Sequence, residues 1–130
     1  GVAARRIQPD ISIDSDVDHA TPEDIGKVDK GEEGDIELGK GVVIPFGPDK
    51  NRDLVYGLMD AATNNGIPYQ LKATMPGGTN TSRIQMEGLD IKTAILSIPN
   101  LYMHCINEKL HWDDVEGCIN LLVSYLEGLK

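Results

Sequence analysis

Apolar and polar positions along the chain follow two periodicities that predict strands and helices in alternation. Runs typical of strands cover 11–17, 41–46, 67–73 and 93–98. Three- and four-residue spacing predicts helices at 51–64, capped by Asn51 or Asp49, and at 115–129, with a short one after Thr79 or Thr81. Residues 2–7 are typical of the last turns of another helix. The order predicts an α/β fold with a mainly parallel or mixed sheet flanked by helices.

Between the first two strands, the segment 20–40 has neither periodicity. It is polar and acidic and contains Pro22 and several glycines, so we expect a long surface loop. Its acidic run, 32–37, is typical of solvated surface.

Length and charge narrow the classes of function. The 130 residues suit one domain, and the net charge of −9 with scattered basic residues argues against a nucleic-acid partner. No apolar run approaches the roughly 20 residues of a membrane span, and the first residues do not follow the signal-peptide order. The sequence therefore predicts a cytoplasmic protein without a membrane partner. Cys105 and Cys118 form no disulfide framework, so reduced thiols are expected.

The stretch 97–108 follows a predicted buried strand and contains His104. Loops at the carboxyl ends of strands are where open α/β sheets bind ligands. A lone histidine is more often structural than a metal ligand, but Asp16 also lies near the end of a predicted strand. Carboxylate and imidazole together suit zinc, cobalt or manganese, so the pair Asp16 and His104 predicts a metal site.

Three other chemical candidates are weaker. The segment Asp14–Asp18 copies the first half of a calcium loop, but His19 stands where glycine is needed and Ile25 where glutamate closes the site. Gly77–Thr79 could cradle an anion, yet no Walker lysine follows. Cys105 as a nucleophile needs an oriented base, and a small semi-buried thiol is the simpler interpretation. No catalytic residue is assigned.

Five motifs along the chain resemble metallopeptidase family forty-two, the glutamyl-aminopeptidase and cellulase-M-like enzymes that include tetrahedral aminopeptidases. The matching segments, in order, are Asp16–Thr21, Leu38–Ile44, Gly66–Gln70, Gly77–Thr79 and Ser97–His104. Each motif alone is weak, but five in order at natural spacing make a specific pattern.

The resemblance implies a zinc-exopeptidase-like, three-layer fold and a dinuclear aminopeptidase that removes amino-terminal residues from peptides. By position, Asp16 would ligate one of two divalent ions (zinc, cobalt or manganese) and His104 the other. The family's other ligands and its general-base glutamate would precede Gly1. We therefore expect 1–130 to be the C-terminal part of a catalytic domain, an incomplete domain that is inactive alone. The family's dimers and larger particles imply a homo-oligomer. Here we expect one smaller than a dodecamer.

The chain departs from the family pattern within the matched region. Asn80 replaces the usual Asp, Leu101 replaces an Arg, and Cys105–Asn107 replaces Ser-Pro-Val. Two hypotheses follow: part of a metallo-aminopeptidase, or a non-catalytic α/β interaction module derived from that fold.

Overall fold

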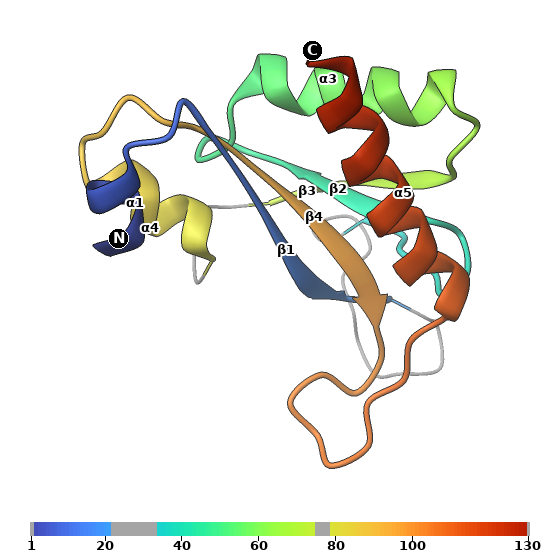
Figure 1. Cartoon of the computed structure of the whole chain (residues 1–130). Coiled ribbons are helices and arrows are strands. Elements are labelled where there is room, and N and C mark those ends of the chain that lie inside the picture. Colours follow the sequence, from blue (N-terminus) through green and yellow to red (C-terminus); the bar gives the residue numbers. More distant parts are fainter. Residues whose placement is uncertain (1, 22–33, 75–78, 130) are drawn as a thin grey trace.

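A computed structural model describes residues 2–21, 34–74 and 79–129, and its elements alternate as the sequence predicts (Figure 1). In chain order the elements are α1 (Val2–Ile7), β1 (Ile11–His19), β2 (Val42–Phe46), α3 (Arg52–Asn64), β3 (Tyr69–Ala73), α4 (Asn80–Met86), β4 (Lys92–Asn100) and α5 (Trp112–Gly128). None of the helices in these ranges is long and apolar enough to cross a membrane.

The four strands form one mixed sheet in the order β1-β4-β2-β3. β1 runs parallel to β4, with Asp16 opposite Ser97, and β2 runs parallel to β3. The two parallel pairs meet antiparallel, where Val43 lies opposite Ser97. The predicted α/β class with a mainly parallel or mixed sheet is confirmed, and the sheet is mixed because β2 and β4 run in opposite directions.

The main core lies between one face of the sheet and the helices α3 and α5, which pack against each other (Figure 1). Alternate residues of a strand point to opposite faces, so Val42 and Ile44 of β2 join Ala94 and Leu96 of β4 in this core. From α3, the buried side chains are Leu54, Val55, Leu58 and Ala62. A second, smaller cluster joins α1 and α4 to the turn before β4 and contains Ala4, Ile84 and Ile91.

Local signals fix the ends of α3 and of the strands beside it. Asn51 is the N-cap, and its side chain accepts a hydrogen bond of 3.0 Å from the Leu54 amide. Gly66 takes the left-handed conformation after the helix, with φ of +64°. Gly41 precedes β2 with φ of +107°, and a Cβ there would lie 2.2 Å from the Pro68 carbonyl oxygen, so only glycine fits.

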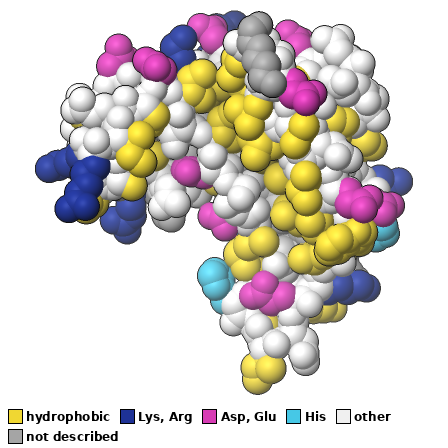
Figure 2. Space-filling model, in the orientation of Figure 1, with side chains coloured by type: hydrophobic (Ala, Val, Ile, Leu, Met, Phe, Trp, Pro, Cys, Tyr) yellow, Lys and Arg dark blue, Asp and Glu magenta, His cyan; other side chains and the backbone are white. Residues whose placement is uncertain are grey.

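Three details differ from the sequence-based expectation. β1 continues to His19, because its pairing with β4 extends through the acidic residues to Asn100. Asp49 does not cap α3. The predicted apolar stripe of α5 is only partly buried: Cys118 lies in the core, whereas Ile119 and Leu126 are 55% and 49% exposed. Figure 2 shows hydrophobic side chains along the front of α5. Periodicity marks an apolar face, but only tertiary packing decides what covers it.

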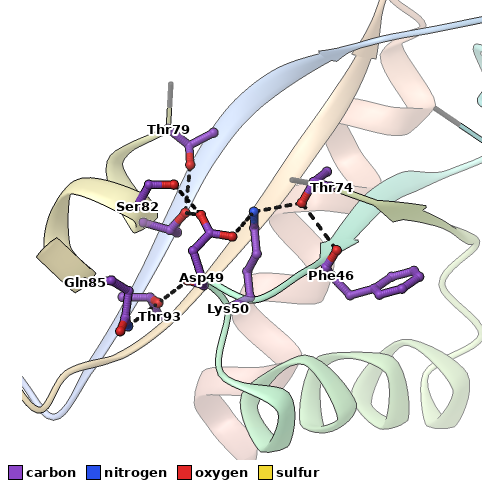
Figure 3. Close-up of polar contacts among 9 residues, drawn as sticks. Phe46, Asp49, Lys50, Thr74, Thr79, Ser82, Gln85 and Thr93 are labelled. Atoms are coloured by element: carbon purple, nitrogen blue, oxygen red, sulfur yellow. Dashed lines mark hydrogen bonds and ion pairs between the residues drawn. The ribbon is translucent and has the colours of Figure 1, made fainter. Parts of the chain in front are cut away.

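Asp49 and Lys50 instead form a buried polar network that joins the β2–α3 link to α4 and β4 (Figure 3). Lys50 Nζ lies 2.7 Å from Asp49 Oδ1 and 2.8 Å from Thr74 Oγ1. Asp49 Oδ2 also accepts hydrogen bonds from Thr81 and Ser82 of α4. Burial of the pair therefore comes with donors and acceptors for both charges, as a buried ion pair requires.

Candidate functional site

The acidic residues of β1 lie on the sheet face opposite the main core. Ile11 and Ile13 pack against that core, so the alternating residues Asp14, Asp16 and Asp18 point to the other face. The parallel pairing with β4 places Asp16 beside Ser97 and Asp18 beside Pro99, close to the carboxyl ends of both strands. This is the end of a parallel strand pair at which α/β folds place ligands.

The three carboxylates have different surroundings. Asp16 is exposed, and its Oδ1 accepts a hydrogen bond of 2.8 Å from the Val17 amide. Asp14 is half-buried, and its Oδ2 atom has no hydrogen-bond partner in the part of the chain that the structure describes. Burial, followed by the nearby charge of Asp16, raises the pKa of Asp14. Asp18 pairs with Lys72 of β3, whose Nζ lies 2.8 Å from Oδ1. Asp16 is therefore the carboxylate that is most available to solvent and to an ion.

His104 lies in a loop that leaves the carboxyl end of β4. The loop is closed at its base by an antiparallel bridge between Leu101 and Lys109, with hydrogen bonds of 2.8 and 3.1 Å. Tyr102 and His104 have φ values of +61° and +65°, which residues other than glycine rarely adopt. The His104 side chain is exposed, so its imidazole is open to a ligand.

Glu108 and Asn100 link this loop to the sheet. Glu108 Oε1 accepts a hydrogen bond of 3.0 Å from the His104 amide, and its Oε2 accepts one of 2.7 Å from Asn100 Nδ2. Hydrogen bonds from the Asn100 side chain and from the His104 amide lower the pKa of Glu108, so the carboxylate form is favoured.

Asp16 and His104 thus belong to the same end of the β1–β4 pair, but no hydrogen bond or ion pair joins these two described side chains. A carboxylate and an imidazole fit a zinc-, cobalt- or manganese-type ion as donors. In 2–21, 34–74 and 79–129, however, no group of three or more His, Cys, Asp or Glu side chains could hold an ion. The described residues therefore supply part of a ligand set and do not complete a metal centre.

Among the described residues, the other candidates from the sequence do not complete a group of three possible metal ligands with this pair. His19 is exposed at the end of β1, and Cys105 is an exposed thiol beside His104. Asn80 begins α4 and is exposed. Ile25 and Gly77–Gly78 lie outside the described residues.

Sequence reasoning missed the residues that support the site. Glu108 is four residues beyond His104 in an exposed loop without periodicity, and nothing in the sequence pairs it with Asn100. Lys72 is on β3 and Asp18 on β1, the two edge strands of the sheet, and they are far apart in the chain, so only the folded structure shows that their side chains meet. An aspartate at an alternating strand position with a distant strand lysine is too common a pattern to have indicated this pair.

The fold and the placement of these side chains define the class: an α/β protein whose mixed sheet matches solved aminopeptidases. An aminopeptidase from the archaeon Desulfurococcus kamchatkensis is 27% identical, with a TM-score of 0.79 over 95% of this chain and 35% of that one. The TET1 peptidase of Pyrococcus horikoshii, described as assembling into a tetrahedron or a large octahedral shell, is 30% identical, with a TM-score of 0.70 over 96% of this chain and 35% of its own.

The chain belongs to the M42 glutamyl aminopeptidase family, which it matches over residues 1–121. A lysyl aminopeptidase of Pyrococcus furiosus is 37% identical over 131 residues, which cover 99% of this chain and 36% of that protein. A putative aminopeptidase of Acetivibrio thermocellus is 29% identical over 94% of this chain and 36% of its own length. The resemblance drawn from the five motifs is confirmed, and the chain spans about a third of the length of these curated relatives.

Proposed function

We propose that this chain forms part of a dinuclear, metal-dependent aminopeptidase that removes amino-terminal residues from peptides, and that Asp16 and His104 each ligate one ion. One observation carries the proposal: in a chain of the M42 family, both side chains are exposed at the same end of the paired strands β1 and β4. In such enzymes the ions polarise the scissile carbonyl and activate water.

The described residues alone give each proposed ion only one ligand, whereas protein sites normally supply about three. We therefore expect the 130-residue chain by itself not to hydrolyse peptides. The remaining ligands and a general-base glutamate would come from polypeptide that corresponds to the rest of the relatives. We further propose a cytoplasmic homo-oligomer, with peptide as the substrate.

A chimera tests this proposal directly. The matching 36% of the Pyrococcus furiosus lysyl aminopeptidase is replaced by this chain, and hydrolysis of aminoacyl anilides and bound metal are measured. We expect metal-dependent turnover that falls by at least about 10²-fold in Asp16→Asn and in His104→Ala, because each change removes a ligand. The isolated chain should show no turnover.

Two matched controls separate ligand loss from general damage. Asp10→Asn changes an exposed aspartate before β1, and His111→Asn changes a histidine to a residue that can keep its N-cap role on α5. Both should retain activity. Full activity in His104→Ala would refute the ligand assignment, and a folded, metal-free, inactive chimera would favour the non-catalytic module instead.

A further inference from the structure

The loop that carries His104 has an unusual backbone for its sequence. Two of its residues, Tyr102 and His104, are left-handed although neither is glycine. Such conformations are disfavoured for L-residues and persist only when surrounding contacts fix them. The turn between them has one internal backbone hydrogen bond, of 3.0 Å, from the Cys105 amide to the Tyr102 carbonyl. The His104 amide itself donates to a side chain.

That side chain is Glu108, which accepts hydrogen bonds from two donors. One carboxylate oxygen accepts from the His104 amide and the other from the Asn100 side chain. Asn100 is 1% exposed and ends β4, and its carbonyl oxygen accepts a hydrogen bond of 2.9 Å from the Ala20 amide just after β1. The Glu108 carboxylate therefore connects the backbone of His104 to a buried residue whose own backbone is hydrogen-bonded to the residue that follows β1.

We propose that Glu108 is a positioning residue for His104: its carboxylate, held by buried Asn100, fixes the left-handed backbone from which the exposed imidazole projects in the loop after β4. The role of that imidazole in binding metal rests on the proposed function. The positioning itself is a property of this loop and can be measured without any ion.

Substitutions of Glu108 can distinguish the effect of its two hydrogen bonds from the effect of its charge. Glu108→Ala removes both hydrogen bonds. Glu108→Asp keeps the charge but shortens the side chain by one methylene, so it cannot reach both partners. Glu108→Gln keeps the length, and its amide can serve both partners if the Asn100 amide turns over. That turn breaks no hydrogen bond of the Asn100 Oδ1 atom to a described residue, because the atom has no partner among them. If Glu108 acts by positioning, Glu108→Gln should retain the left-handed backbone at His104 and Glu108→Asp should lose it. If its charge is what matters, the reverse is expected.

The first experiment uses NMR on the isotope-labelled 130-residue chain. In the wild type we expect a strong HN–Hα NOE at His104, the signature of a positive φ, and slow amide exchange. Glu108→Ala and Glu108→Asp should weaken that NOE and speed exchange of the His104 amide by about 10- to 100-fold, the range for loss of one hydrogen bond to a charged acceptor. Glu108→Gln should stay within a few-fold of the wild type.

Glu116→Ala is the matched control, because that exposed glutamate also accepts a hydrogen bond, from Trp112 Nε1, but lies on α5 and not in the loop. It should leave the His104 signals unchanged. If Glu108→Ala does not fold, the comparison of Glu108→Asp with Glu108→Gln still tests the positioning role. An unchanged NOE and exchange rate in Glu108→Asp, or rescue by Asp rather than Gln, would overturn the proposal.

The second experiment asks whether the position matters to metal binding, and it uses zinc competition with a chelating dye on the chimera. Residues that orient a ligand typically change metal affinity by about 10- to 100-fold, so Glu108→Ala should weaken zinc binding by that factor and Glu108→Gln should largely restore it. Unchanged affinity in a variant whose loop has lost its NOE would overturn the link to the site. A wild-type chimera without zinc would refute the proposed function, while the NMR result would still decide the positioning.

Discussion

Replacing Lys50 with methionine should destabilise this protein severely at neutral pH. The Lys50 and Asp49 side chains are only 2% and 5% exposed, and the Nζ atom makes two short bonds, to Asp49 and to Thr74. Methionine has similar length but leaves the Asp49 carboxylate buried without its cation. Removing one partner of a buried ion pair typically costs about 3–5 kcal/mol. Since domains are stable by about 5–15 kcal/mol, the variant should lie near the limit of folding.

The pH dependence gives this prediction a second test. Burial raises the pKa of Asp49, but hydrogen bonds from Lys50 and Ser82 and the charge of Lys50 more than offset burial and hold it below the ordinary value of 3.8. A lowered folded pKa stabilises the wild type above pH 3.8, and that contribution is lost as the pH falls through the folded pKa. Without Lys50, burial should raise the pKa, so the penalty of the substitution should be largest at pH 7 and shrink on acidification.

Urea unfolding followed by circular dichroism at pH 7 and near pH 4 measures both effects. The control is Arg52→Met, since Arg52 is an exposed cation 5.2 Å from the Tyr56 ring centre and should contribute no more than about 1 kcal/mol. The double variant Asp49→Asn with Lys50→Met removes both charges and should recover part of the loss. A penalty for Lys50→Met below about 1 kcal/mol, or one equal at the two pH values, would refute the reasoning.

Two further predictions concern α5 and the thiols. Asp114→Ala should lower the free energy of unfolding, measured by urea denaturation, by about 3 kcal/mol. The buried carboxylate accepts hydrogen bonds of 2.7 and 2.8 Å from the Gly39 and Gly41 amides, each contributing about 1.5 kcal/mol. A loss under about 1 kcal/mol would contradict this. A thiol reagent should label exposed Cys105 at least about 10²-fold faster than Cys118 of α5, which is 6% exposed and whose pKa is raised by burial. Two equal rates would show that Cys118 is not packed in the core between α5 and the sheet.

The sequence by itself determined the kind and order of most elements and the family. Strand and helix periodicities arise from short-range geometry, so they predicted β2, α3, β3 and β4 closely, and Asn51 marked the start of α3 by local hydrogen bonding. Motifs at fixed spacing indicated the family, and by position in those motifs Asp16 and His104 became the proposed ligands.

Only the tertiary structure decided which distant side chains meet. Asp49 looked like a helix cap in the sequence, yet it binds Lys50, Thr81 and Ser82, because folding brings α4 against the β2–α3 link. The pairing of Lys72 with Asp18 joins β3 to β1, the two edge strands, and depends on how the sheet is assembled. The hydrogen bonds of Glu108 to the Asn100 side chain and the His104 amide depend on a loop that closes on itself. Such contacts have no period and no fixed spacing, so a linear pattern does not encode them in readable form.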